Sequence, residues 1–320
     1  MQPLVSVIIP AFNRGKLIGE TLASVAAQQY KNWECIVVDD GSDDDTLQVA
    51  GNFAASDARF KIFSRPGHLK KGANNSRNFG FQQSSGSLVL FFDSDDLMLP
   101  GKLLLQVESL ADPGIDYCVD RFDNFSDGER PQPEWAFDEN LNAGVALRDY
   151  VVHEVFWGTI NFMGRRDLFL KSEFHEDLKS GQEYYFFTSV AVNNPKAKGV
   201  FLNRTLSLRR IHSASIQQEQ RSLAVARLEN KFAVYWKVLE DFGPSLDDRA
   251  VKYLLRSAVV FYHKLLLAGK NLIGLRPIYT EIFRKFGMQK GLTSIAPLLA
   301  GRYLRMGDRW GSAVLNRNLK

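Results

Sequence analysis

The sequence contains little cysteine and no long uninterrupted apolar stretch. Only 2 of its 320 residues are cysteines, too few for a disulfide framework, so a reducing cytoplasm is the expected compartment. One of them, Cys35, lies inside an apolar run, where a small buried thiol is a better interpretation than a reactive one. No stretch approaches the roughly 20 apolar residues of a membrane-spanning helix, and the N-terminus lacks the basic and apolar regions of a signal peptide. We therefore expect a chain that does not cross a membrane.

Two familiar phosphate-binding motifs are also missing. The sequence has no Gly-x-x-x-x-Gly-Lys followed by Ser or Thr, which argues against a P-loop NTPase. A dinucleotide-binding dehydrogenase needs Gly-x-Gly-x-x-Gly after its first strand, but Pro-Ala-Phe-Asn occupies residues 10–13. Because no basic and aromatic platform or DNA-reading motif appears, we expect no nucleic-acid partner.

Charge is distributed unevenly along the chain. The net charge is +4, yet residues 217–320 hold 18 Lys and Arg against 8 Asp and Glu, so the first 216 residues are net acidic. Clustered aspartates in an acidic region suit cations, whereas a basic region suits phosphate-rich surfaces. For the basic region, contact with an anionic membrane, an oligomer contact and simple solvation all stay open.

Short β-branched runs alternate with helical patterns, which predicts an α/β fold with a mainly parallel sheet flanked by helices. The run at residues 87–92 is almost wholly apolar and is typical of a central strand buried on both faces. Further strands are expected at residues 5–10, 34–39, 60–64, 116–122, 154–163 and 200–211. Helices are expected at residues 16–29, 44–54, 102–110, 166–171 and 183–193, and from residue 74 onward.

From residue 217 onward, the apolar periodicity becomes helical. Apolar residues recur at three-to-four spacing in residues 223–239, 250–267 and 277–286. We therefore predict two domains, an α/β domain at residues 1–216 and a basic helical region at residues 217–320.

Polar clusters follow three of the expected strands, at residues 10–13, 39–42 and 93–96. Because the carboxyl ends of parallel strands meet at one edge of an open sheet, the three clusters should face one pocket. The cluster Asp-Ser-Asp-Asp at residues 93–96 places like charges together, which repel unless a cation or hydrogen bonds compensate them. Mg²⁺ or Mn²⁺ prefers such oxygen ligands. The alternative interpretation is that these aspartates cap the following helix.

These clusters resemble the ordered motifs of family 2 glycosyltransferases. The resemblance is carried by Val-Ser-Val-Ile-Ile-Pro-Ala-Phe-Asn (5–13), Val-Val-Asp-Asp-Gly-Ser (37–42), Ser-Arg-Asn-Phe-Gly (76–80) and Phe-Phe-Asp-Ser-Asp-Asp (91–96). It covers about residues 4–216 and implies a GT-A fold, a Rossmann-like mixed sheet flanked by helices. It also implies an inverting enzyme of the EC 2.4 class that transfers a sugar from a nucleotide sugar to a hydroxyl acceptor, in polysaccharide or glycolipid synthesis.

The resemblance assigns donor-binding residues position by position. Asp40 matches the aspartate that hydrogen-bonds the donor's base, commonly uracil, and the backbone around Pro10 and Ala11 would hold the same base. Asp93 matches the acid near the donor ribose. Arg77 is similar to the family's basic residue near the nucleotide; a solvated helix arginine is the alternative. The full predicted donor-binding set is Pro10, Ala11, Asn13, Asp40, Arg77 and Asp93.

The same resemblance implies a Mn²⁺ or Mg²⁺ ion that bridges the donor diphosphate. Asp95 matches the acid of the Asp-x-Asp motif that ligates the metal. Residues 208–216 resemble the end of the family's catalytic domain, so that His212 would ligate the metal or contact the diphosphate. The alternative for His212 is a surface or capping histidine.

Residues 174–183 resemble the family's segment that ends in Glu-Asp and supplies the general base. Here the pair reads Gln182-Glu183, so the base would be Glu183, although a glutamate that only stabilises a helix dipole is the alternative. This departure keeps open a nucleotide-sugar-binding or scaffolding protein without turnover. A sugar nucleotidyltransferase has a related fold, but it expects a Gly-rich first loop with a lysine, which residues 10–15 do not provide.

The predicted partners are a UDP-linked sugar donor and a saccharide or lipid-linked acceptor. The identity of the acceptor would be set by loops such as residues 124–142 and 156–158. If the basic C-terminal region contacts lipid, the cytoplasmic enzyme would work at the inner face of the membrane.

Overall fold

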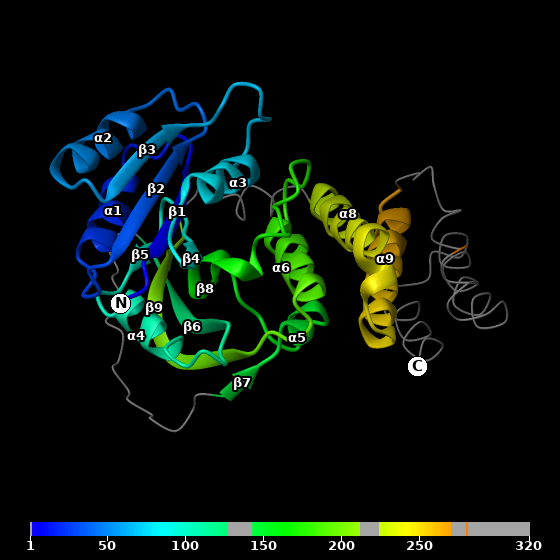
Figure 1. Cartoon of the computed structure of the whole chain (residues 1–320). Helices are drawn as coiled ribbons and strands as arrows, with labels where there is room; N and C mark the ends of the chain where they lie inside the picture. Colours follow the sequence, from blue (N-terminus) through cyan, green and yellow to red (C-terminus); the bar gives the residue numbers. More distant parts are fainter. Residues whose placement is uncertain (1, 127–142, 212–223, 270–279, 281–320) are drawn as a thin grey trace. The chain divides into compact units, whose positions relative to one another are not determined.

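The computed structural model describes residues 2–126, 143–211, 224–269 and 280. The chain divides into two compact units (Figure 1). Unit 1 comprises Met1–Asp177 and Gln182–Ser213, and unit 2 comprises Leu178–Gly181 and Ala214–Lys320. The predicted boundary between residues 216 and 217 lies outside the described residues and stays a prediction.

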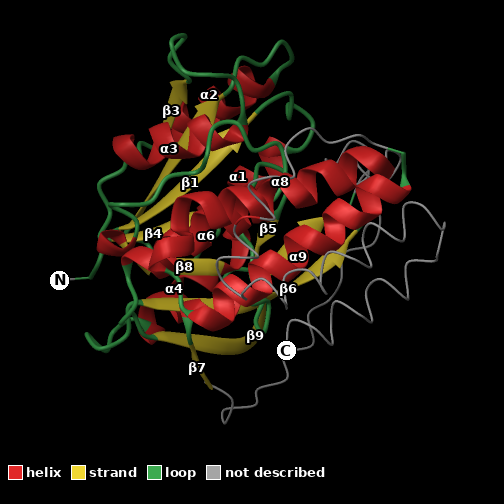
Figure 2. Cartoon of the chain, turned by 90° about the vertical axis from the view of Figure 1, so that its right-hand side faces the viewer, coloured by secondary structure: helices red, strands yellow, loops and turns green. Residues whose placement is uncertain are grey.

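Unit 1 is built around one mixed sheet, which has nine strands in the described part of the chain. Their order is β3-β2-β1-β4-β8-β6-β9-β5, with β7 paired to β9, and Figure 2 shows most of them following one another from top to bottom. β1–β4, β6 and β9 share one direction, while β5, β7 and β8 oppose it. The mixed, mainly parallel sheet that the sequence predicts is therefore confirmed. The strands are β1 (Val5–Ala11), β2 (Trp33–Asp39), β3 (Phe60–Ser64), β4 (Leu88–Phe91), β5 (Leu97–Met98), β6 (Tyr117–Phe125), β7 (Ala143–Val145), β8 (Phe162–Arg165) and β9 (Gly199–Arg210).

Helices cover both faces of this sheet. On one face, apolar side chains of the helices pack with inward residues of β1 and β2 such as Ile9 and Val37. On the other face, Phe186 lies edge-on against Phe91 of β4, with ring centroids 5.5 Å apart. The first layer holds α1 (Ile18–Ala26), α2 (Thr46–Ser56) and α4 (Lys102–Ser109), and the second holds α3 (Ala73–Gln83) and α6 (Gln182–Asn193) (Figure 1).

β4 is a central strand, as predicted. All four of its residues are buried, and it lies between β1 and β8. Both cysteines are also free and fully buried inside this core, Cys35 on β2 and Cys118 on β6. The interpretation of Cys35 as a small buried thiol is confirmed, and burial raises the pKa of both thiols.

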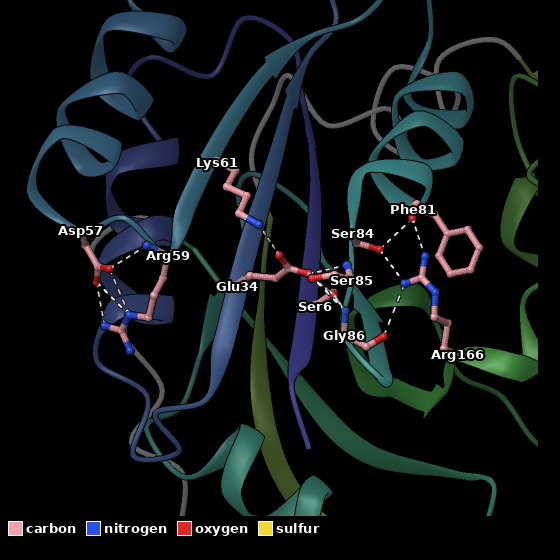
Figure 3. Close-up of polar contacts among 10 residues, drawn as sticks. All are labelled: Ser6, Glu34, Asp57, Arg59, Lys61, Phe81, Ser84, Ser85, Gly86 and Arg166. Atoms are coloured by element: carbon pink, nitrogen blue, oxygen red, sulfur yellow. Dashed lines mark hydrogen bonds and ion pairs between the residues drawn. The ribbon is translucent and has the colours of Figure 1, made fainter. Parts of the chain in front are cut away.

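A buried glutamate fastens the amino-terminal edge of the sheet (Figure 3). Glu34 Oε1 accepts hydrogen bonds from Ser6 Oγ at 2.7 Å, Ser85 N at 2.6 Å and Gly86 N at 3.2 Å. Its Oε2 accepts from Lys61 Nζ at 2.7 Å. Burial alone would raise the pKa of Glu34, but the hydrogen bonds outweigh burial and lower the pKa to about 2. β1, β2, β3 and the loop that enters β4 are thus tied to one carboxylate.

An arginine at the same edge holds the C-terminal end of α3 (Figure 3). Arg166 Nη2 donates to Phe81 O at 3.0 Å, and Nη1 donates to Ser84 Oγ at 3.0 Å. The guanidinium also lies over the Phe81 ring, 4.5 Å from its centroid. A cation at this end of a helix satisfies carbonyls that lack helical partners.

The predicted strand at residues 154–163 is wrong over most of its length. Residues 159–161 form the 3₁₀ turn η1 (Thr159–Asn161), and strand geometry begins only at Phe162. The apolar pattern arises because Trp157 is buried among aromatic rings and not within a β-sheet. Its ring centroid lies 4.4 Å from that of Tyr150. The helix predicted at residues 166–171 is only the 3₁₀ turn η2 (Arg166–Leu168), and β5, β7 and α5 (Leu147–Val151) were not predicted.

Unit 2 contains two helices in its described part, α8 (Ala224–Phe242) and α9 (Asp248–Leu267), separated by η3 (Gly243–Ser245). They pack on each other through aromatic rings; Tyr235 stacks on Phe261 with centroids 5.7 Å apart. These helices confirm the helical pattern of residues 223–239 and 250–267, whereas residues 277–286 lie outside the described ranges. Within those ranges, no helix has the length and apolarity needed to span a membrane.

Candidate active site

The three polar clusters predicted from the sequence leave the sheet at the same edge. Ala11 pairs with Asp39 at the ends of β1 and β2, and Ile8 pairs with Phe91 at the end of β4. The first turn after β2 is tied back to β1, because Asp40 N donates to Ala11 O at 2.8 Å. Pro10 and Ala11 therefore lie beside Asp40, as their predicted shared role requires.

Asn13 fastens the first loop to the second. Its backbone adopts the left-handed conformation, with φ of 51°, which asparagine tolerates better than most residues. Asn13 N donates to Ser42 Oγ at 2.9 Å, and Asn13 Oδ1 accepts from Asp43 N at 3.0 Å. The side chain thus positions the two loops, and the donor contact assigned to Asn13 stays a prediction.

Asp40 is buried beneath the start of α3. Its Oδ1 accepts from Arg65 Nε at 2.5 Å and from Ser76 Oγ at 3.5 Å. Among the described residues, no donor is bonded to Oδ2, so this oxygen can accept a hydrogen bond from the N–H of a base. Arg65 follows β3 directly and was not predicted, although the rule that functional groups gather at strand ends applies to β3 as well.

Asp39, given no role in the sequence analysis, is a second acceptor at this edge. Its Oδ2 accepts from Gly41 N and Ser42 N, both at 3.0 Å. Its Oδ1 is buried and has no hydrogen-bond partner in the described ranges. A buried acceptor without a hydrogen-bond partner is costly. Asp39 is therefore, like Asp40, a candidate to accept a hydrogen bond from a ligand.

Arg77 and Asp93, both predicted to bind the nucleotide, form an ion pair. Arg77 Nη2 lies 2.6 Å from Asp93 Oδ1. The Arg77 side chain is only 9% exposed and that of Asp93 is 35% exposed. The guanidinium lies over the Phe174 ring, 5.2 Å from its centroid. Arg77 is therefore not the solvated helix arginine of the alternative interpretation.

The aspartates at residues 93–96 do not cap the next helix. The N-cap of α4 is Gly101, and the amide of Leu103 in the first turn donates to Gln28 Oε1 at 3.0 Å, not to an aspartate. Instead Asp96 is buried and accepts from Arg210 N at 2.9 Å, which anchors the loop to β9. Burial, followed by the charges of Asp93 and Asp95, raises the pKa of Asp96 well above its usual range.

Asp95, the predicted metal ligand, faces cationic neighbours. Its Oδ2 lies 3.4 Å from Arg14 Nε, and its backbone oxygen accepts from Arg210 Nε at 3.0 Å. Arg14 follows Asn13 in the first loop, so this ion pair joins the first and third clusters. Neither arginine was predicted as part of the site, because an ion pair between distant segments leaves no local pattern.

The carboxylates suit a cation that a substrate completes. Within the described residues, no group of three or more His, Cys, Asp or Glu is arranged to hold a metal ion by itself. Mg²⁺ and Mn²⁺ usually take one or two carboxylates together with substrate phosphates and water. Asp93 and Asp95 fit this chemistry, with side chains 35% and 18% exposed. His212 lies outside the described residues and stays a prediction.

Glu183, the predicted base, lies in the first turn of α6. Its Oε1 accepts from Thr159 N and from Thr159 Oγ1, both at 2.8 Å. Thr159 begins η1, which leads into β8, and β8 is antiparallel to β4 with Leu90 opposite Met163. This register places Thr159 near the carboxyl end of β4, where Asp93 follows. Glu183 and the aspartates therefore share one edge of the sheet, and the catalytic role of Glu183 stays a prediction.

Comparisons of the sequence with known proteins point to one enzyme family. The sequence model of glycosyl transferase family 2 matches residues 6–170, just over half of the chain. The GalNAc(5)-diNAcBac-PP-undecaprenol β-1,3-glucosyltransferase of Campylobacter jejuni is 27% identical over 238 residues, which are 74% of this chain and 72% of that protein.

Two solved structures have a similar fold. S. aureus TarS 1-349 in complex with UDP-GlcNAc has a TM-score of 0.61 at 19% identity, and the match covers 98% of this chain and 90% of that chain. The mannosyltransferase PcManGT from Pyrobaculum calidifontis, in complex with GDP-Man and Mn²⁺, has a TM-score of 0.58 at 18% identity and covers 100% and 88%. These likenesses confirm a fold of the GT-A type.

Proposed function

Because the chain belongs to glycosyl transferase family 2, we propose that it moves a sugar from a UDP-sugar to a hydroxyl of a lipid-linked saccharide, with inversion. The UDP donor is supported by the TarS complex with UDP-GlcNAc, and GDP, as in the PcManGT complex, is the alternative base. The lipid-linked acceptor is supported by the Campylobacter relative, whose name places a saccharide on undecaprenol diphosphate.

One observation carries the proposal: a closed set of contacts links all three loops with α3. Asp40 contacts Ser76, and the next residue, Arg77, pairs with Asp93. The third loop is joined to the first by the ion pair of Asp95 Oδ2 with Arg14 Nε at 3.4 Å. In the proposed complex Asp40 accepts from the base, Asp93 lies near the ribose, and Pro10, Ala11 and Asn13 shape the wall of the pocket.

Asp95 would hold Mn²⁺ or Mg²⁺ in this complex, with His212 as the second proposed protein ligand. When bound, the cation would neutralise the charge that develops on the departing nucleoside diphosphate. Arg77 adds fixed positive charge beside Asp93, 2.6 Å from its Oδ1.

Glu183 would serve as the general base. Its Oε1 is held by Thr159, and in the described part of the chain no donor is bonded to Oε2, which can therefore accept a proton. As the acceptor oxygen bonds to the anomeric carbon, its proton passes to Glu183 and the bond from carbon to the diphosphate oxygen breaks. A positioned carboxylate of this kind contributes roughly 10² to 10⁴ in rate.

A lipid-linked acceptor would require work at a membrane surface. We propose that the basic region at residues 217–320, which carries 18 Lys and Arg, rests on anionic lipid at the inner face of the membrane. The test is co-sedimentation of the full chain, and of a variant lacking residues 271–320, with anionic vesicles. Equal binding of the two would contradict lipid contact by residues 271–320.

A thermal-shift screen followed by a transfer assay tests the proposed reaction. We expect UDP-sugars with Mn²⁺ to raise Tm by about 5 °C at saturation, and GDP-sugars or EDTA-treated samples to give far less. Asp40→Asn should abolish the shift, whereas Asp167→Asn, an exposed aspartate after β8, serves as a matched control. A GDP-selective shift would overturn the UDP assignment, and donor binding without hydrolysis or transfer would favour a binding protein.

A further inference from the structure

A four-residue turn surrounds one oxygen of Glu183. Gly158 precedes η1, and a Cβ added to this glycine would lie 3.3 Å from Glu183 Oε1. The next residue, Thr159, donates to the same oxygen from both its backbone N and its hydroxyl, each at 2.8 Å. Two donors and the absence of a side chain at position 158 therefore fix the position of Oε1.

The turn itself is held rigidly. Asn161 Oδ1 accepts from Gly158 N at 2.8 Å, and Asn161 Nδ2 donates to Asp120 O at 2.5 Å. Thr159 and Asn161 are 1% and 2% exposed. Asp120 is in turn anchored to α4, because its Oδ2 accepts from Lys102 Nζ at 2.5 Å. The support for Glu183 thus reaches the core of the sheet.

This arrangement leaves one oxygen of Glu183 for chemistry. Since both hydrogen bonds go to Oε1, the direction of Oε2 is set by the turn and not by solvent. A buried threonine hydroxyl often bonds to a backbone oxygen of its own helix, as Thr188 of α6 does with Tyr184 O at 2.7 Å. The hydroxyl of Thr159 bonds to a carboxylate instead.

We propose that Thr159 is a positioning residue for catalysis, whose hydroxyl orients Glu183 so that Oε2 receives the proton of the acceptor hydroxyl. The inference rests on the proposed function, since it requires Glu183 to act as the base. Thr159 itself touches neither donor nor acceptor in this role. Gly158 contributes by leaving room for the carboxylate.

Thr159→Val tests the role of the hydroxyl, because valine keeps the shape and the backbone N–H. We expect kcat for transfer to fall about tenfold, the effect of one lost hydrogen bond to a charged group, while the Kd for UDP changes less than about twofold. Thr159→Ser keeps the hydroxyl and should restore kcat to within about twofold of wild type. The matched control, Thr188→Val, removes a buried hydroxyl from α6 and should leave kcat unchanged.

Gly158→Ala provides an independent route to the same result. Its backbone φ of −112° accepts alanine, and the added Cβ displaces Glu183 without removing any donor. We expect kcat to fall about tenfold here as well, again with unchanged UDP binding.

A double-mutant cycle separates positioning from a general effect on folding. In a Glu183→Gln background, Thr159→Val should cause no further loss of kcat, because the two residues act as a unit. Equal fold losses in both backgrounds, or wild-type kcat in Thr159→Val, would overturn the inference. If Glu183→Gln itself keeps wild-type turnover, the base assignment fails; if Glu183→Gln is impaired and Thr159→Val is not, only the positioning role fails.

Discussion

At the two edges of the sheet in unit 1, the pKa values of buried carboxylates are shifted in opposite directions. At the amino-terminal edge, hydrogen bonds to Glu34 outweigh burial and lower its pKa to about 2. At the carboxyl-terminal edge, burial and the nearby charges of Asp93 and Asp95 raise the pKa of Asp96 well above its usual range. One edge surrounds a single negative charge with donors, and the other crowds several negative charges together.

This difference separates stability from function within one sheet. The donors around Glu34 stabilise its ionised form, so this edge favours the folded chain. Crowded carboxylates oppose folding unless positive charge compensates them; here Arg77 and Arg14 supply part of it, and a bound cation could supply more. The comparison predicts that removing a carboxylate has opposite consequences at the two edges.

The largest expected effect is on catalysis at the carboxyl-terminal edge. Asp95→Asn should lower kcat about a hundredfold or more in saturating Mn²⁺, because the proposed metal loses its anionic ligand. The free energy of unfolding should change little, because weaker repulsion from Asp93 and Asp96 offsets the lost ion pair with Arg14. Transfer kinetics and urea denaturation measure the two quantities, with Asp167→Asn as the control; unchanged turnover would refute the metal assignment.

At the amino-terminal edge, the same kind of substitution should reduce stability and spare catalysis. Glu34→Gln should lower the free energy of unfolding by about 2 kcal/mol, because buried charge-assisted hydrogen bonds are lost. Turnover of the folded enzyme should be unchanged. Glu176→Gln breaks an exposed pair with Lys70 at 3.1 Å and should cost less than about 0.5 kcal/mol. Equal losses for the two variants would contradict the importance of burial.

The contribution of Glu34 should disappear in acid. Its pKa is lowered on folding, so the stabilisation is complete above the unfolded value of about 4.3 and is lost as the pH falls through about 2. Urea denaturation of wild type and Glu34→Gln across this range, followed by tryptophan fluorescence, should show the stability difference shrinking as the pH falls. A difference that stays constant with pH would show that Glu34 acts through shape alone.

The smallest expected effect concerns the arginine that holds the end of α3. Arg166→Met should lower the free energy of unfolding by about 1 kcal/mol, because it removes donors to Phe81 O and Ser84 Oγ but keeps an apolar stem over the ring. Arg166→Lys should lower the free energy of unfolding somewhat less than Arg166→Met does. A change in transfer kinetics at saturating donor would contradict the separation of the two edges.

Much of the fold was predictable because local pattern and tertiary environment agree. The strand at residues 60–64 matches β3, and the run at 87–92 is a central strand because apolar residues must be buried on both faces. β5 was not predictable, since this two-residue strand exists only through its antiparallel partner Leu208 on β9. The segment around Trp157 misled the prediction because rings buried in an aromatic cluster mimic strand alternation.

The candidate site also has a part that the sequence predicts and a part that it does not. The convergence of Asp40, Asp93 and Asp95 at one edge follows from strand polarity, which the sequence pattern conveys. Their partners Arg14 and Arg65 depend on side chains that meet only after folding. The support of Glu183 by Thr159, 24 residues earlier, has no sequence signal at all. The roles assigned to these residues stay predictions until the assays are done.

The contact between α3 and the sheet has a consequence for redesign. A Cβ on Gly80 would lie 2.6 Å from Ile8 Cγ2 and 3.2 Å from Val38 Cγ2, so this glycine sets how closely the helix rests on β1 and β2. Arg77 stands one turn earlier on the same helix and reaches Asp93 at 2.6 Å. A single methyl group at position 80 would therefore act as a spacer that moves the guanidinium away from its carboxylate, and it would change the proposed nucleotide site without replacing any residue assigned to that site.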